Sequence, residues 1–292
     1  MAHKINLVVI DPQRSFCSTM DPLEQQKIHD GELCVQGAWD DMVRVANMVK
    51  RLGRKIDDIH VTMDSHHYLH IAHPLWFRDT KGSQPAPFTT MREEKGVIVG
   101  AQYDSAGNLH DVGEYTTVKP SLLKWTLEYL KSLATNKRYA HMIWPPHCLI
   151  GTRGHTIVEP LFEALLEWEK ENVGYVNYVT KGSNYRVEHF SAVQAEVPDP
   201  NDAVNTGLNT DFIEAVMEGD EILLCGEASS HCLANTVIDI ANTFKDDSFI
   251  KKCILLTDGT SAVTGLKFLE EHFVKEMTAR GMRLSTTVEY LS

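Results

Sequence analysis

One cysteine stands where a thiol could do chemistry. In the segment EILLCGEASSHCLANT, residues 221–236, an apolar run ends at Gly226, and small or polar residues lead to Cys232. A segment compatible with a helix follows, so the pattern predicts a strand, a tight turn and a helix with Cys232 at its start. A cysteine in this place could be inert packing, a metal ligand or a nucleophile.

Ionisable residues also follow the other predicted strands. The first four strands are followed by Asp11, by the pair Asp64 and His66, by His147 and by Lys181. Each residue alone is more typical of a cap or a solvated side chain. Because ligands in open α/β sheets bind beyond the carboxyl ends of the strands, the joint pattern instead predicts a site at that edge.

Three of these residues suit a metal ion. Asp64 and His66 are two positions apart at a strand end, so an extended backbone points both to the same side. With His147 they supply two imidazoles and one carboxylate, a set that suits zinc, iron or manganese.

Short apolar runs alternate with longer segments of helical spacing, which predicts an α/β fold. We expect three layers, with helices on both faces of a doubly wound, mainly parallel six-stranded sheet. The expected strands are residues 5–10, 58–63, 140–144, 174–180, 221–226 and 252–257, with residues 284–290 as a further edge. The expected helices lie near residues 38–52, 120–136, 158–171, 209–217, 232–244 and 264–280.

Two stretches interrupt this alternation. Residues 77–118 are rich in glycine, proline and polar residues without a sustained period, and a shorter insertion lies near residues 17–30. A long irregular segment of this kind is typically a lid, a binding loop or an inserted excursion. We therefore expect a single domain, residues 1–292, with two insertions.

The composition limits the classes of partner and the compartment that we expect. The net charge of −12 disfavours nucleic acid and anionic membranes, and no run reaches the roughly 18 apolar residues of a membrane span. The six cysteines, in a long chain whose start lacks a signal-peptide pattern, are expected to be reduced, which favours the cytoplasm. We expect a homo-oligomer that acts on a small molecule.

The strand ends together resemble a known superfamily. The segments VVIDPQRSFC, MDSHHYLHIAHPLWF, WPPHCLIGT, VTKGSNYRVEHFSA and CGEASSHCLANT, in this order, resemble the isochorismatase-like cysteine hydrolases, and among them the nicotinamidases. The resemblance covers most of the chain outside the two insertions. It implies hydrolysis of nicotinamide to nicotinic acid and ammonia in NAD salvage.

The resemblance implies a catalytic triad of Asp11, Lys181 and Cys232. A helix N-terminus and a nearby ammonium both favour a thiolate, so the chemistry agrees with Cys232 as nucleophile. Asp11 would take the thiol proton and later deliver it to the leaving ammonia, a role that needs a raised pKa. By analogy, the amides of Ala228 and Cys232 form the oxyanion hole, and the Glu227–Ala228 peptide bond is cis.

The resemblance also implies a divalent ion at Asp64, His66 and His147, most commonly zinc, with iron or manganese as alternatives. In the family this ion binds the ring nitrogen of the substrate, and Phe16, Trp144 and Phe190 are at positions that wall the flat ring. His70 matches a histidine of the family motif and is expected to support the ligands. His67 and His73 are expected to face solvent or the insertion.

The chain departs from the family pattern in several places. Ser65 and His67 stand where many relatives have tryptophan and proline, and His231 precedes the nucleophile. Glu227 replaces a small apolar residue in the turn. These departures and the insertions could change which substrate the protein takes, whereas they leave the predicted triad and metal residues in place.

Three other hypotheses remain open. A different amidase of the same superfamily would act on a larger or different amide, whereas an isochorismatase proper does not need the metal residues. A non-haem iron oxygenase also uses two histidines and a carboxylate, although it has no use for Cys232. A non-catalytic relative would bind a metabolite or a partner and would need no reactive thiol.

Overall fold

The centre of the fold is a parallel sheet of six strands. The computed structural model describes residues 3–17, 32–104, 108–244 and 246–292. In these residues the main sheet has the order β11-β10-β9-β1-β2-β8, and every neighbouring pair is parallel. Its strands are β1 (Ile5–Ile10), β2 (Asp58–Asp64), β8 (Asn177–Lys181), β9 (Glu221–Gly226), β10 (Cys253–Leu256) and β11 (Arg283–Ser285).

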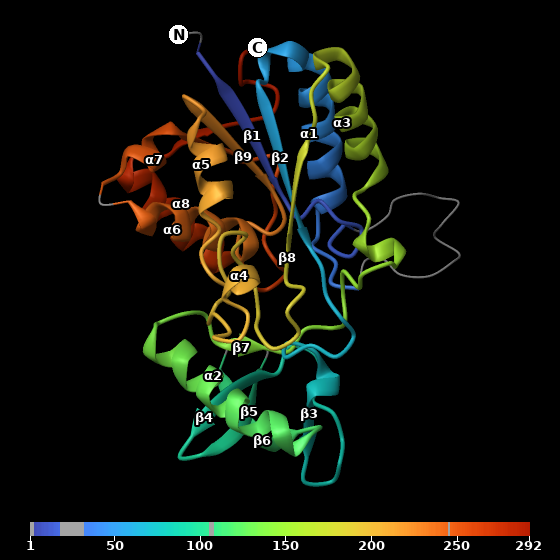
Figure 1. Cartoon of the computed structure of the whole chain (residues 1–292), viewed down its shortest axis with the longest axis vertical. Coiled ribbons are helices and arrows are strands. Elements are labelled where there is room, and N and C mark those ends of the chain that lie inside the picture. The colour runs from blue at the N-terminus through green and yellow to red at the C-terminus, as the bar shows by residue number, and fades with distance from the viewer. Residues whose placement is uncertain (1–2, 18–31, 105–107, 245) are drawn as a thin grey trace.

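Helices cover both faces of this sheet, which confirms the predicted three-layer α/β architecture. On one side lie α1 (Ala38–Leu52) and α3 (Glu159–Asn172) (Figure 1). On the other side lie α5 (Thr210–Met217), α6 (Cys232–Thr243), α7 (Ser248–Lys252) and α8 (Lys267–Arg280). A short helix, α4 (Ala203–Thr206), precedes α5.

The apolar runs of the sequence are buried on both sides. All six residues of β1, with the sequence INLVVI, are buried between the two helical layers. A strand covered on both faces needs no alternation of polar and apolar residues, and this explains the continuous run. The helices show the complementary pattern, with a stripe of buried residues such as Met42, Val45 and Val49 along α1.

One predicted strand belongs elsewhere. The segment 140–144 forms only β7 (His141–Met142), which pairs antiparallel with β4 of a second sheet, and β11 takes the sixth place in the main sheet. Two prolines, Pro145 and Pro146, follow directly. Because proline has no N–H to donate, the segment cannot continue as a central strand.

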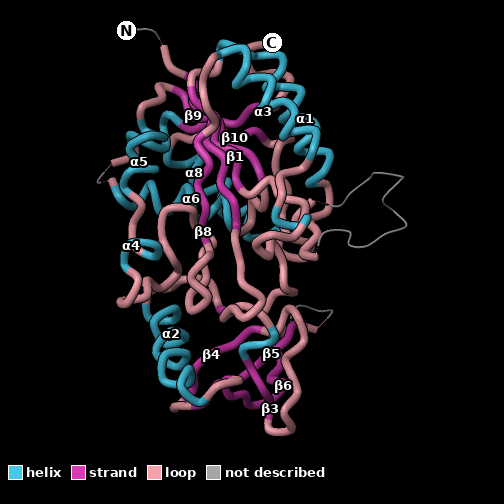
Figure 2. Tube along the Cα trace, turned by 45° about the vertical axis from the view of Figure 1, so that its right-hand side comes forward, coloured by secondary structure: helices cyan, strands magenta, loops and turns pink. Residues whose placement is uncertain are grey.

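The insertion at residues 77–118 is regular, and the prediction of an irregular segment is wrong. It forms β3 (Phe77–Asp79), β4 (Thr90–Glu94), β5 (Val97–Tyr103) and β6 (Leu109–Thr117), in an antiparallel sheet of order β3-β6-β5-β4-β7. Lys95 and Gly96 join β4 to β5 with φ of 51° and 85°, as a two-residue hairpin requires. Helix α2 (Leu123–Thr135) packs on this sheet around Tyr129 and Leu133 (Figure 2).

The carboxyl edge of the main sheet faces the second sheet. Both chain ends lie at the opposite end of the molecule, and β1 runs from there toward the insertion (Figures 1 and 2). The other predicted insertion, near residues 17–30, falls almost wholly on residues 18–31 and lies outside the described residues. The prediction of one domain with two insertions stays a prediction.

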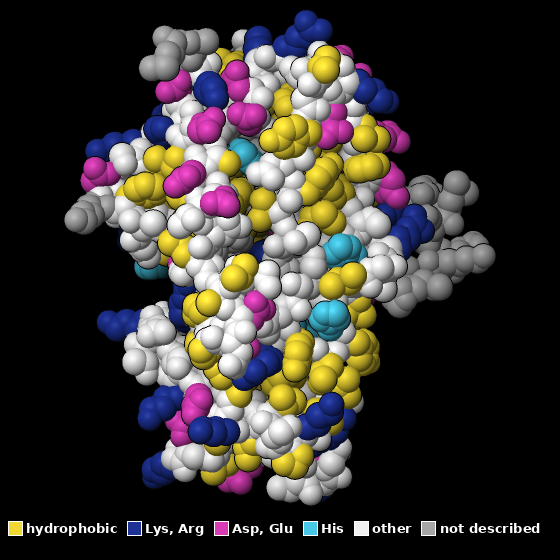
Figure 3. All heavy atoms as spheres, viewed as in Figure 1, with side chains coloured by type: hydrophobic (Ala, Val, Ile, Leu, Met, Phe, Trp, Pro, Cys, Tyr) yellow, Lys and Arg dark blue, Asp and Glu magenta, His cyan; other side chains and the backbone are white. Residues whose placement is uncertain are grey.

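The surface carries charges of both signs. On the face shown in Figure 3, lysine and arginine side chains lie among aspartate and glutamate and do not join into a continuous basic patch. In the described part of the chain, no helix combines the length and the apolar character that a membrane crossing requires.

Candidate active site

The register of the sheet brings the predicted catalytic residues together. Strand β2 lies between β1 and β8, and Asp64 at its end pairs with Lys181 at the end of β8. Asp11 directly follows β1. On the other side of β1, Ile10 pairs with Gly226, from which the chain turns to Cys232 at the start of α6.

Lys181 is at the centre of this group. Its Nζ lies 2.9 Å from Asp11 Oδ2, 3.1 Å from Asp64 Oδ1 and 3.8 Å from Cys232 Sγ, and it donates to the carbonyl of His189 at 2.9 Å. The side chain is almost completely buried. The structure therefore brings the three predicted triad residues into contact around one ammonium group.

Electrostatics keeps Lys181 charged. Burial alone would lower the pKa of Lys181, but the carboxylates of Asp11 and Asp64 outweigh it and hold that pKa well above its usual value. Burial raises the pKa of Asp11 in spite of Lys181, as expected for a group that must accept a proton. His66 and Lys181 overcome the effect of burial on Asp64 and hold its pKa well below its usual value.

Asp11 is held by the neighbouring strand. Thr62 of β2 donates through its hydroxyl to Asp11 Oδ1 at 2.6 Å and accepts from the Asp11 amide at 3.0 Å. The backbone of Asp11 has a φ of 43°, in the left-handed region that aspartate tolerates better than most residues. One oxygen is thus fixed on Thr62, and the other is directed at Lys181.

The turn between β9 and α6 has the expected form. Gly226 has a φ of 103°, and the peptide bond between Glu227 and Ala228 is cis. Among the hydrogen bonds of the described residues, neither the Ala228 amide nor the Cys232 amide has an acceptor. Both amides are therefore available to a ligand.

The structure explains Glu227, whose presence in the turn was unexpected. Its carboxyl group is fully buried. Burial and the charge of Asp41 on α1 raise the pKa of Glu227 well above its usual value. Glu227 Oε2 accepts from the amide of Ser261 at 3.2 Å, and the Ser261 hydroxyl donates to Asp41 at 2.5 Å. The turn is thereby tied to α1 and to the loop after β10.

The expected bias toward a thiolate is not observed. Burial raises the pKa of Cys232 well above the usual value, and Asp11 and Asp64 add to this effect, while Lys181 opposes it. The position at a helix start and the nearby ammonium do not compensate for two carboxylates in a buried site. The resting group is a thiol, so a base must remove its proton when it attacks.

Asp64, His66 and His147 form a buried group that could hold a metal ion. Asp64 Oδ2 lies 2.8 Å from His66 Nε2 and 3.4 Å from His147 Nε2. The Nδ1 atoms of the two rings lie 3.2 Å from the carbonyl of Gly182 and 2.9 Å from that of Pro145. When Nδ1–H donates to a carbonyl, Nε2 presents a lone pair. Two lone pairs and a carboxylate oxygen facing one another fit a cation.

The neighbouring histidines differ in their roles. His70 Nδ1 accepts from the Ala72 amide at 3.2 Å, so its neutral ring carries the proton on Nε2 and is a donor. It packs against His66 with ring centroids 4.2 Å apart, which agrees with a supporting position. His67 is exposed as predicted, whereas His73 is buried beside His66 and His147, so its predicted position facing solvent is wrong.

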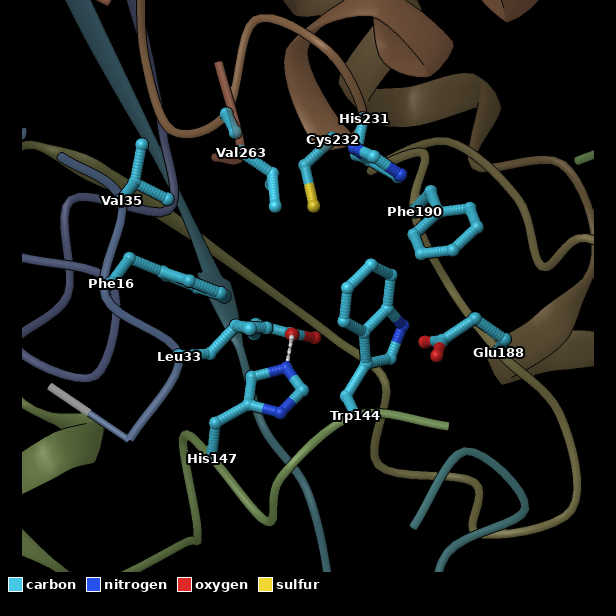
Figure 4. A pocket seen from close by; sticks show the side chains of 12 residues that line it. Phe16, Leu33, Val35, Trp144, His147, Glu188, Phe190, His231, Cys232 and Val263 are labelled. Carbon is cyan, nitrogen blue, oxygen red and sulfur yellow. Dashed lines mark ion pairs between the residues drawn. The ribbon is translucent and has the colours of Figure 1, made fainter. Parts of the chain in front are cut away.

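A pocket opens between the thiol and the possible metal group. Cys232 and His231 lie at one end and His147 at the other (Figure 4), and Ala228 and Asp64 also line the pocket. The side walls contain the three predicted aromatic residues: Phe16, Trp144 and Phe190. Leu33 and Val35 also line this pocket.

Sequence reasoning missed one acidic residue of the pocket. Glu188 lines it and is buried, and burial raises the pKa of its carboxyl. Glu188 follows Lys181 by seven residues within the segment VTKGSNYRVEHFSA. The same segment contains Lys181 and Phe190, which were both predicted to belong to the site. An acidic residue between them was the signal in the sequence that could have identified Glu188.

The inserted sheet supports one wall of the pocket. Ile143 exchanges backbone hydrogen bonds with Phe88 and Thr89, which lead into β4. The ring of Phe88 meets Trp144 edge-on at 5.8 Å. The insertion thus positions the strand that carries Trp144 and leads to His147.

A second buried network fixes the loop that carries Phe190. Arg138 binds both carboxylate oxygens of Asp239 on α6, at 2.8 and 2.9 Å, and its Nε lies 3.4 Å from Glu196 Oε2. Burial outweighs Arg138 and raises the pKa of Glu196 to about 8.

This raised pKa predicts a pH-dependent stability. An unfolded glutamate has a pKa of about 4.3. Protonated Glu196 contributes to the free energy of unfolding because the folded protein holds this proton more tightly than the unfolded chain does. That contribution is complete below pH about 4.3 and is lost as the pH rises through about 8. From about pH 6 to about pH 9, the melting temperature of the unsubstituted protein should fall a few degrees more than that of Glu196→Gln. Thermal melts across this range test it, and parallel curves for the two proteins would contradict it.

Comparison with known proteins agrees with this fold. No protein-family model matches the sequence, and no curated protein matches it. Solved structures match over the whole chain. The yeast nicotinamidase bound to the inhibitor nicotinaldehyde is 18% identical with a TM-score of 0.59, and the match covers 97% of this chain and 99% of that one.

Two further structures are similar. For a nicotinamidase and pyrazinamidase of Acinetobacter baumanii the identity is 17% and the TM-score 0.58, covering 99% of this chain and 98% of the other. A pyrazinamidase of Pyrococcus horikoshii in complex with zinc is 17% identical with a TM-score of 0.51, and the match covers 97% of this chain and 99% of that one. These likenesses show that the chain shares the fold of these solved nicotinamidase and pyrazinamidase structures, as predicted.

Proposed function

We propose that this chain is a metal-dependent amidohydrolase that converts nicotinamide to nicotinic acid and ammonia through a thioester on Cys232. The observation that carries the proposal is the position of Lys181, whose Nζ contacts Asp11, Asp64 and Cys232 at once. One buried cation thereby joins an acid–base group, a nucleophile and the group that could hold a metal.

In the first half of the reaction, Asp11 accepts the thiol proton as Cys232 Sγ attacks the carboxamide carbon. A bond forms between sulfur and carbon, and the carbonyl oxygen gains the negative charge. Asp11 then gives its proton to the amide nitrogen, the carbon–nitrogen bond breaks, and ammonia leaves the thioester. The raised pKa of Asp11 suits both transfers.

The developing oxyanion would be stabilised by the amides of Ala228 and Cys232, which have no acceptor among the described residues. Fixed donors of this kind typically contribute a factor of about 10² to 10³ to the rate. In the second half, water attacks the thioester while Asp11 takes its proton, the carbon–sulfur bond breaks, and the thiol is restored with nicotinic acid as product.

Asp64, His66 and His147 would hold the ion, with zinc as the first candidate and iron or manganese as alternatives. When bound, the ion would supply a Lewis acid that takes the ring nitrogen of the substrate and so orients the ring. Phe16, Trp144 and Phe190 then cover the faces and edge of a flat ring, which keeps the carboxamide at Cys232.

Ammonia release tests this function. The metal-loaded protein should release ammonia from nicotinamide, and from benzamide at least about 10²-fold more slowly, because benzamide lacks the ring nitrogen while keeping the same carboxamide. Release from neither compound, with metal bound, would contradict nicotinamide as the substrate. Equal rates for both would contradict the role of the ring nitrogen.

A further inference from the structure

Glu188 has a polar atom for which the mechanism above provides no partner. Its amide donates to the Tyr129 hydroxyl at 3.2 Å, its carbonyl accepts from the Glu196 amide at 2.9 Å, and its Oε1 accepts from the His189 amide at 2.9 Å. The remaining atom, Oε2, is buried and has no hydrogen-bond partner among the described residues. A buried carboxylate oxygen left in this state is costly, so it calls for a ligand.

The neighbours of the Glu188 carboxylate indicate a cation as the ligand. Ligand atoms of Glu188, His66 and His70 lie within 4.8 Å of one another, and His66 also belongs to the group with Asp64 and His147. His66 Nε2 lies 2.8 Å from Asp64 Oδ2, and with Nδ1–H donating to the Gly182 carbonyl it presents a lone pair toward a cation. Figure 4 shows the Glu188 carboxylate directed into the pocket, toward the ring of Trp144. The two groups thus share His66.

His70 does not compete for a cation. Because the Ala72 amide donates to its Nδ1, its Nε2 carries a proton and has no lone pair to give. Of the second group, only His66 and Glu188 can therefore bind a cation, and His70 can donate a hydrogen bond to the carboxylate.

Charge balance favours the same conclusion. Lys181 forms ion pairs with Asp11 and Asp64, so one positive charge already lies between two carboxylates. A divalent ion added to this group leaves one positive charge in excess. A second carboxylate at the ion removes that excess, which matters where the charged side chains are buried.

We propose that Glu188 is a fourth protein group at the divalent ion and supplies a second carboxylate beside Asp64, His66 and His147. The inference rests on the proposed function for the presence of the ion. It means that the loop after β8 binds the metal at Glu188 and the catalytic Lys181 at the His189 carbonyl. Metal binding and the position of Phe190, two residues further on, are then coupled.

Metal affinity tests this proposal without reference to turnover. The dissociation constant for Zn²⁺ is measured by chelator competition on metal-free protein. Glu188→Gln should bind about 10- to 100-fold more weakly than the unsubstituted protein. Glu196→Gln is the matched control, since Glu196 is a buried glutamate of the same loop that contacts Arg138, and its affinity should be unchanged. Equal affinity of the two variants would overturn the proposal.

Further measurements distinguish a failure of this proposal from a failure of the proposed function. Asp64→Ala should bind Zn²⁺ more weakly than Glu188→Gln does. If the unsubstituted protein bound no Zn²⁺, Co²⁺, Fe²⁺ or Mn²⁺, this proposal and the ion of the proposed function would both fall. If Glu188→Gln does not fold, Glu188→Asp keeps the charge, and the visible spectrum of its Co²⁺ form should shift while that of Glu196→Asp does not. An unshifted spectrum would overturn the role of Glu188.

Discussion

Replacing Cys232 by alanine should lower kcat by more than about 10⁴-fold, because no other group can form the acyl intermediate. Binding of nicotinamide should stay within a few-fold, since the ring is held by the aromatic walls and the metal group and not by the thiol. Steady-state ammonia release gives the rate, and calorimetric titration of the metal-loaded variant gives the binding constant.

The same variant separates the competing functions. An iron oxygenase built on Asp64, His66 and His147 would keep its activity in Cys232→Ala. A non-catalytic binding protein would show no turnover before or after the change. Cys34→Ser, which removes an exposed thiol, is the control and should keep full activity. Normal turnover in Cys232→Ala would contradict the mechanism.

Asp11→Asn should lower kcat by about 10³-fold, because the carboxamide cannot accept the thiol proton. Asparagine has the same shape and can still accept from Thr62, so the fold should be kept. The change also removes a negative charge that raises the pKa of Cys232, and Lys181 then faces the thiol with less competition.

Asp11→Asn therefore has two effects of opposite sign. Turnover falls, while alkylation of Cys232 by iodoacetamide at neutral pH becomes several-fold faster, because more of the thiol is ionised. Peptide mass spectrometry follows the label on Cys232, in the Cys34→Ser background to remove the exposed thiol. A parallel fall of turnover and alkylation would show a damaged site and would contradict the role of Asp11 as base.

The strand ends were predictable because parallel strands place their carboxyl ends at one edge. Asp11, Asp64 and Lys181 follow strands that lie side by side, and the register of Asp64 with Lys181 needs only the order of β1, β2 and β8. Cys232 follows from the turn after β9, which flanks β1 on the other side. Local pattern and strand order were sufficient for these four residues.

The inserted sheet was not predictable from period alone. Its longest strand, β6, is exposed along most of its length, and β4 buries only its first two residues before a run of charged ones. A strand with one thin buried face has little apolar alternation to detect. The segment 140–144 was assigned to the wrong sheet for a different reason. Its apolar run indicates a strand but does not show which sheet the strand joins.

Side chains fixed by loop contacts were also beyond the sequence. The raised pKa of Glu227 depends on its burial and on Asp41, which is far away in the chain. The tautomers of His66 and His70 depend on the individual backbone groups that they meet. The pKa of Cys232 was predicted in the wrong direction because the helix start and Lys181 were considered without the depth of burial and the second carboxylate.

The most direct test of the account is to observe the covalent intermediate. Metal-loaded protein is mixed with nicotinamide, quenched in acid within the first turnover and digested, and the peptides are analysed by mass spectrometry. We predict a nicotinoyl group on the peptide that contains Cys232. The group should be absent in Cys232→Ala, and it should be lost when the mixture is incubated at neutral pH before the quench. Turnover of nicotinamide with no acyl group on Cys232 at any quench time, or with the group on another residue, would contradict it.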